Sequence, residues 1–172
     1  SGTANFDEAN FEAALVYDLT SDADGSTLTG GGNADTLAGG AGVDTITGGA
    51  GADNLTGSGG FDTASYADVT VATSHGLTNI SGMAINLSAT EIAAATIATA
   101  MGGTIVVGGG AAVAGAALAT GSAGYLASSS ANSTATMVRD TLTTFEAVTG
   151  SALGDYIALG SGGMSVNGGD GI

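Results

Sequence analysis

Bulky apolar residues recur at a fixed spacing in the first third of the chain. Leu28, Leu37, Ile46 and Leu55 follow one another at intervals of nine, and an aspartate stands two positions before each of the last three. One apolar position between polar neighbours predicts short β-strands, and the glycine runs between them predict turns. Two strand-and-turn units of nine residues would complete one coil. We therefore expect a solenoid of parallel strands, with Leu37 stacked on Leu55 and Leu28 on Ile46.

The aspartates share this register and carry the chemical argument. Stacked coils place Asp35 beside Asp53 and Asp44 beside Asp62. Like charges held close together repel, so the bare coil opposes its own folding. Calcium reverses this effect, because it takes six to eight oxygen ligands and combines carboxylates with backbone carbonyls. Glycine turns leave carbonyls unobstructed, so we expect calcium binding and folding to be one linked event.

The repeated unit resembles a known sequence pattern. Residues 30–65 read GGGNADTLA, GGAGVDTIT, GGAGADNLT and GSGGFDTAS, and the middle two match G-G-x-G-x-D-x-U-x at every fixed position. The departures are Asn33, Ser58 and Ala64. The chain is thus similar to the RTX, or hemolysin-type calcium-binding, family. The resemblance implies a mainly β fold, a calcium-binding parallel β-roll, in a bacterial protein exported by type I secretion that folds outside the cell.

Several calcium ions are expected, and the candidate ligands fall into two sets. The carboxylate candidates are Asp35, Asp44, Asp53, Asp62, Asp155 and Asp24. The backbone carbonyl candidates are Gly39, Gly40, Ala41, Gly42, Gly48, Gly49, Ala50 and Gly51. Asp24 belongs to a degenerate repeat at 22–29, and whether it binds calcium stays open.

A second stretch, residues 141–172, resembles a return to the roll. Residues 150–158 read GSALGDYIA, with Asp155 at the ligand position and Ile157 at the core position. Met164 stands where the next aspartate belongs. We interpret this stretch as a second, truncated roll segment, and the chain as a piece of a longer protein.

The remaining segments are assigned by composition. Residues 1–20 are expected to form an N-terminal strand or linker, residues 21–66 the first roll, and residues 67–140 a large insertion rich in Ala, Gly and Thr. Within the insertion we predict strands at 69–71, 83–87 and 105–107, a short helix at 89–100 capped by Ser88 or Thr90, and a polar loop at 128–136.

Composition excludes several classes of partner. The formal net charge is −15, with one Lys or Arg against 16 Asp and Glu, so neither nucleic acid nor an anionic membrane surface is expected to bind. Residues 92–120 are uncharged but only weakly hydrophobic, and no membrane insertion is expected. There is no cysteine for disulfides or thiolate metal sites.

No catalytic motif is recognisable, so an enzyme is not expected. His75 is the only histidine, and neither H-E-x-x-H nor G-x-S-x-G occurs. The favoured hypothesis is a calcium-dependent structural module of a secreted cell-surface protein, a surface layer (S-layer) or matrix fibre, with self-assembly on calcium binding. Two alternatives stay open: a domain of an RTX adhesin, whose insertion would bind a glycan or another cell-surface ligand, and the non-catalytic tail of a secreted enzyme.

Overall fold

The computed structural model describes residues 2–5, 14–19, 22–70, 80–93, 96–97, 100, 106–107, 118–127 and 139–170. Nearly all regular structure in these ranges is β-strand. The strands are β1 (Gly2–Asn5), β2 (Val16–Asp18), β3 (Ser26–Thr29), β4 (Thr36–Ala38), β5 (Thr45–Thr47), β6 (Asn54–Thr56), β7 (Thr63–Ser65), β8 (Ile80–Asn86), β9 (Val106–Val107), β10 (Ser122–Ala127), β11 (Arg139–Thr143), β12 (Ala147–Thr149), β13 (Tyr156–Ala158) and β14 (Ser165–Asn167).

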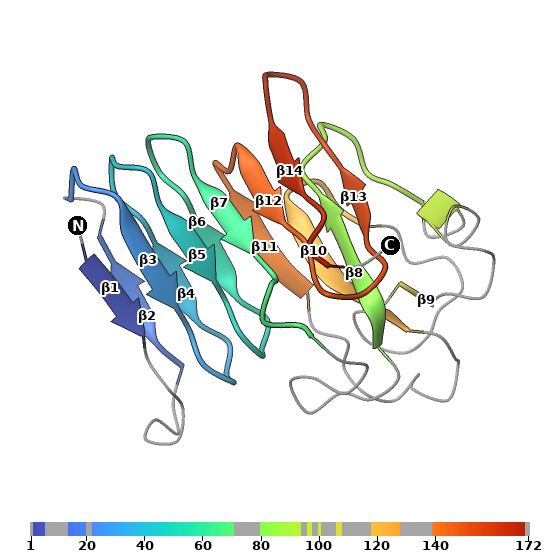
Figure 1. Cartoon of the computed structure of the whole chain (residues 1–172), viewed down its shortest axis with the longest axis horizontal. Coiled ribbons are helices and arrows are strands. Elements are labelled where there is room, and N and C mark those ends of the chain that lie inside the picture. The colour runs from blue at the N-terminus through green and yellow to red at the C-terminus, as the bar shows by residue number, and fades with distance from the viewer. Residues whose placement is uncertain are drawn as a thin grey trace.

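The strands form two sheets, and along the repeats the chain alternates between them. One sheet has the order β1-β3-β5-β7-β12-β14, and the other has the order β13-β8-β10-β11-β6-β4-β2, with β9 paired to β10. Successive strands of the repeat region go to opposite sheets, so that each coil contributes one strand to each. Figure 1 shows the strands stacked from the blue β1 and β2 on the left towards the red β13 and β14. This is the parallel β-roll that the nine-residue pattern predicts.

The predicted stacking of apolar residues is confirmed. Leu28 pairs with Ile46 across β3 and β5, and Leu37 pairs with Leu55 across β4 and β6. These four side chains are at most 1% exposed and belong to one buried cluster. Short strands suffice here because each inward side chain is covered by those of the neighbouring coils.

The roll continues after a long gap in the sequence. β11 pairs in parallel with β6, which sets Leu142 against Leu55. β12 pairs in parallel with β7, which sets Val148 against Ala64. The segment that begins at Arg139 therefore takes the place of the next coil, although it lies more than 80 residues further along the chain than the strands it covers.

Strands from the intervening segment extend only one of the sheets. β10 pairs antiparallel with both β11 and β8, and β13 then pairs in parallel with β8. The predicted strand at 83–87 is confirmed for residues 83–86 of β8, although Leu87 follows the strand, and that at 105–107 is confirmed for the two residues of β9. Ile105 and the polar loop predicted at 128–136 lie outside the described residues.

One prediction for this segment is wrong, and a second is confirmed only in part. Val69 and Thr70 are not in a strand, although Val69 is buried in the core, and Val71 lies outside the described residues. The helix does not begin near Ala89: helical geometry is described only at residues 96, 97 and 100.

The physical reason for the late helix start is a competing β-bridge. Ile92 and Leu118 exchange two backbone hydrogen bonds, of 3.0 and 2.7 Å. The predicted cap Ser88 instead donates its hydroxyl to Asn86 Oδ1 at 2.6 Å.

In the described part of the chain, no helix has the length and apolar character needed to span a bilayer.

Candidate calcium centre

The aspartates of the repeats form two ladders along the roll, one on each side. In each ladder the carboxylate of one coil accepts a backbone N–H from the coil before it. Asp44 N–H donates to Asp62 Oδ1 at 2.9 Å, and Asp35 N–H donates to Asp53 Oδ1 at 2.9 Å. All four carboxylates are buried, with exposures of 0 to 2%. The structure therefore brings together the pairs that the sequence predicts.

Both ladders continue into residues that the sequence analysis did not propose as ligands. Asp53 N–H donates to Asp140 Oδ1, and Asp62 N–H donates to Glu146 Oε2, each at 3.0 Å. We call Asp44, Asp62 and Glu146 the first ladder, and Asp35, Asp53 and Asp140 the second. Asp140-Thr141-Leu142 and Glu146-Ala147-Val148 both have the form acid-x-apolar, which is the signal that could have revealed these two residues.

The second carboxylate oxygen closes the turn within a repeat. Gly40 N–H donates to Asp44 Oδ2, and Gly31 N–H donates to Asp35 Oδ2, each at 2.7 Å. This bond spans four residues and fixes the carboxylate over the glycine turn. Asp62 does not make this bond, and its buried Oδ2 has no hydrogen-bond partner among the described residues.

The first glycines of three repeats, Gly30, Gly39 and Gly57, lie beside small cradles of oxygen atoms. A Cβ placed on Gly39 would meet Asp44 Oδ2 and the carbonyl oxygen of Gly57, which belongs to the next coil. A Cβ on Gly30 would likewise meet Asp35 Oδ2 and the carbonyl oxygen of Gly48. Oxygens from two successive coils thus converge on a space that only glycine leaves open.

These cradles fit calcium. Carboxylate and carbonyl oxygens are the hard ligands that calcium prefers. Among the described residues there is no group of three or more His, Cys, Asp or Glu side chains that could hold a metal by themselves. Each ion would therefore need backbone carbonyls as well as the aspartates, which is the mixed ligand set expected from the sequence.

The predicted carbonyl candidates have different surroundings. The carbonyl of Gly48 faces the cradle of Gly30. Those of Gly39 and Gly40 accept hydrogen bonds from Ser58 Oγ at 3.1 Å and from Gly59 N–H at 3.0 Å. Ala41, Gly42, Gly49, Ala50 and Gly51 lie in the same turns of the roll.

Electrostatics favour a bound cation in the first ladder. Burial, the largest effect, raises the pKa of Asp62, and the nearby charges of Asp44 and Glu146 raise it further, against a hydrogen bond from the Asp44 backbone that lowers it. Buried charges need partners. The sequence holds a single Lys or Arg against 16 acids, so side-chain cations cannot supply them.

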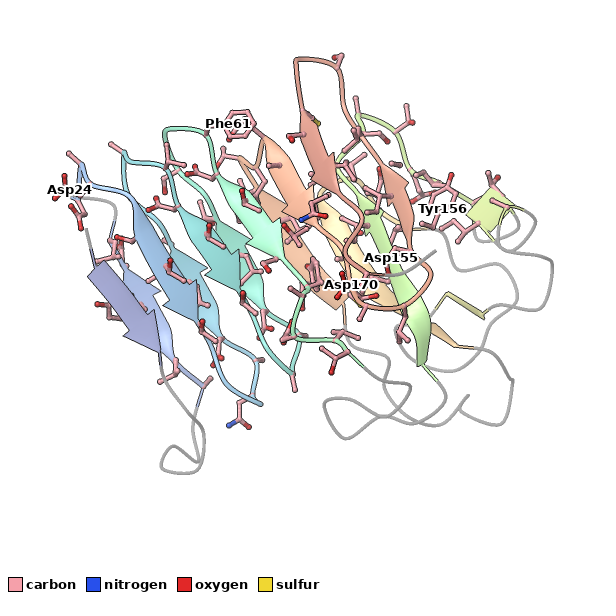
Figure 2. All side chains as sticks on the ribbon, viewed as in Figure 1. Asp24, Phe61, Asp155, Tyr156 and Asp170 are labelled. Atoms are coloured by element: carbon pink, nitrogen blue, oxygen red, sulfur yellow. The ribbon has the colours of Figure 1, made fainter. Side chains whose placement is uncertain are left out.

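Asp155 and Asp24 lie away from these ladders. Asp155 Oδ1 accepts the backbone N–H of Met83 at 2.7 Å, and its Oδ2 accepts that of Ser151 at 2.7 Å. Its cradle, beside Gly150, repeats the geometry of the first roll. Asp24 is exposed in the turn before β3, and Figure 2 shows it at the opposite end of the roll from Asp155.

Comparisons with known proteins agree with this geometry. The family model of the RTX calcium-binding nonapeptide repeat matches residues 29–64 in four copies. No curated protein and no solved structure matches the chain. Residues 29–64 are therefore RTX repeats, which bind calcium ions and typically occur in secreted proteins.

Proposed function

We propose that this chain is a calcium-folded structural module of a secreted bacterial surface protein, part of a surface layer or a matrix fibre, and that it self-assembles when calcium binds. The observation that carries the proposal is the pair of buried carboxylate ladders in a chain with one basic residue. Such ladders resist folding until a cation joins them. Calcium outside the cell would therefore decide where the module folds.

Linkage gives the size of this effect. A ligand that binds only the folded state stabilises it by about 2.7 kcal/mol when its concentration is a hundred times the dissociation constant. Several such ions together would match the whole stability of a typical domain, about 5–15 kcal/mol. A glycine-rich chain with 32 glycines depends on this contribution, because glycine loses more backbone freedom on folding than other residues.

The strands at both ends of the described roll present edges with which another strand can pair, either from further coils of a longer chain or from a second copy. Val166 in β14 pairs with Val148 in β12, yet Val166 is 44% exposed and Val148 only 1%. Val16 in β2, the last strand of its sheet at the other end, is 78% exposed. Edge strands with uncovered apolar side chains add further strands readily. A second copy of this chain is the occupant that a layer or fibre requires.

The proposal assigns no catalytic role to the space of about 210 Å³ beside Gly150. Its lining holds one titratable side chain, Asp170, so it provides no acid–base pair. His75 lies outside the described residues. The alternative hypothesis is a domain of an RTX adhesin, and binding to a glycan or another cell-surface ligand would distinguish it.

The test is a calcium titration of metal-stripped protein, followed by far-UV circular dichroism and sedimentation velocity on the same samples, with magnesium as the control cation. We expect strand signal and larger species to appear together between sub-millimolar and millimolar calcium. Folding without assembly would reject the layer or fibre. A stripped protein that is already folded and does not respond would reject calcium-dependent folding itself.

A further inference from the structure

The first ladder changes character where the roll passes from the fourth repeat to β12. The turn before β7 spans residues 57–62, whereas β11 and β12 are joined by only Thr144, Phe145 and Glu146. Thr144 has a φ of 55°, which makes the tight turn without a glycine. Glu146 then takes the place of the aspartate of the next coil.

Backbone contacts hold this junction in register. Asp62 donates its N–H to Glu146 Oε2 at 3.0 Å, and its carbonyl accepts the N–H of Ala147 at 2.9 Å. Ser58 N–H donates to Thr144 Oγ1 at 2.8 Å. Both segments are therefore fixed on either side of the same small space.

An unpaired oxygen points into that space. Asp62 is fully buried, and its Oδ2 has no hydrogen-bond partner in the described part of the chain. A Cβ on Gly57 would meet this oxygen and the carbonyl oxygen of Thr144 together. A carboxylate of one segment and a carbonyl of the other thus converge as they do in the repeats.

The second ladder provides a comparison, because its junction with the later segment is built differently. There Asp140 takes the place of the next aspartate, and the Tyr66 hydroxyl donates to its Oδ2 at 3.0 Å. A neutral donor from the chain satisfies that carboxylate. The counterpart of Asp62 in this ladder is Asp53, and the three atoms nearest to a Cβ added on Gly48 all belong to Asp53, so no carbonyl of segment 139–149 is among them.

We infer that Asp62, Glu146 and the Thr144 carbonyl hold a calcium ion that joins segment 139–149 to the four repeats. The inference rests on the proposed calcium-dependent folding. It goes beyond the repeat pattern, because Glu146 and Thr144 lie outside the matched residues 29–64. The ion closes a separation of 84 residues, so it controls whether the later strands dock on the repeats.

The test is hydrogen–deuterium exchange of the whole chain, measured by mass spectrometry across a calcium titration. Segment 139–149 reports the junction, and segment 36–47 reports the repeats within the same molecule. Glu146→Gln keeps an oxygen that can accept the Asp62 N–H but removes the charge. Glu91→Gln, on an exposed side chain, is the matched control for net charge.

We expect Glu146→Gln to need about tenfold more calcium, or greater, to protect segment 139–149, since calcium affinity follows the charge of the ligands. Segment 36–47 should respond as in the parent and in Glu91→Gln. Equal behaviour of the two variants at segment 139–149 would overturn the inference and leave Glu146 as a hydrogen-bond acceptor only.

Two further outcomes separate this inference from the proposed function. If calcium protects segment 36–47 while segment 139–149 is equally protected with and without it, the junction site is refuted and calcium-dependent folding stands. If neither segment responds to calcium, both are refuted.

Discussion

Replacing Gly39 by alanine tests whether the cradle of oxygen atoms beside this glycine is needed. The new Cβ would meet Asp44 Oδ2, and it would lie 2.7 Å from the carbonyl oxygen of Gly57 and 2.9 Å from Asp44 Cγ. Real Cβ atoms do not approach other atoms this closely, and the Gly57 carbonyl belongs to the backbone. The substitution must therefore displace oxygens that we assign to calcium. Gly59→Ala is a matched control, because the nearest atom to its Cβ is the Ala41 Cα at 3.8 Å.

The expected difference between the two variants can be worked out. Overpacking of this kind costs about 1–3 kcal/mol. Alanine at Gly59 has room and no left-handed φ, so it should stabilise by about 0.4–1 kcal/mol through the unfolded chain. The free energies of unfolding of Gly39→Ala and Gly59→Ala should then differ by about 1.5–4 kcal/mol, with Gly39→Ala the less stable.

Urea unfolding at a fixed, saturating calcium concentration measures this difference, since urea does not chelate the ion. With a slope of about 1–3 kcal/mol per molar urea, the two midpoints should lie roughly 1 M apart. The calcium concentration at half-folding should rise for Gly39→Ala and fall slightly for Gly59→Ala, because calcium binding and folding are linked. Coincident urea midpoints and coincident calcium midpoints would refute the cradle as the binding site.

Three further perturbations test the ladder and the core. Asp44→Asn leaves an amide nitrogen that cannot accept the Gly40 N–H, so the free energy of unfolding should fall by about 1–3 kcal/mol, and calorimetry should show weaker calcium binding. Asp24→Asn, on an exposed side chain, should change neither quantity if Asp24 is no ligand. Leu55→Ala should cost about 2–5 kcal/mol in calcium-saturated urea unfolding, because Leu55 is fully buried; a cost below about 1 kcal/mol would contradict the stacked core. Without calcium, burial raises the pKa of Asp62 in the folded state, so its ionisation opposes folding above that pKa, and the calcium-free chain should gain folded structure as pH falls towards the unfolded value of 3.8. Asp62→Asn should flatten that part of the pH dependence of stability, and an unchanged profile would show that Asp62 is not its source.

The repeat region could be predicted from sequence because its contacts are periodic. A spacing of nine for both Leu37 and Asp35 fixes which residues meet one coil later, and the register of β4 and β6 follows directly. The hydrogen bonds that hold each aspartate carboxylate of the repeats could not be predicted. Its Oδ1 bonds to the backbone N–H of the preceding coil, and no residue pattern shows this contact.

The middle of the chain was harder to predict because its contacts are not local. The apolar pattern at 89–100 indicates a helix, but Ile92 pairs with Leu118, which lies 26 positions away. Tertiary pairing overrides helix propensity there. Asp140 and Glu146 were missed as ladder members for the same reason, since their neighbours Asp53 and Asp62 precede them by 87 and 84 residues.

Polymer entropy shows why the roll tolerates this long separation. Closing a loop of 84 residues instead of 18 costs only about 1.4 kcal/mol more, because the cost grows with the logarithm of length. Burying one large apolar side chain contributes about 1.5–3 kcal/mol, and the junction buries both Leu142 and Val148. This burial offsets the extra closure cost, so what calcium must still supply at the junction is neutralisation of the charges of Asp62 and Glu146. The unit that a β-roll requires is the short strand with its acid and its inward apolar residue. A spacing of nine is not required, because Asp140 and Glu146 are only six residues apart, as are Leu142 and Val148. The family pattern accordingly stops at residue 64, while the stacked architecture continues through β12 and β14.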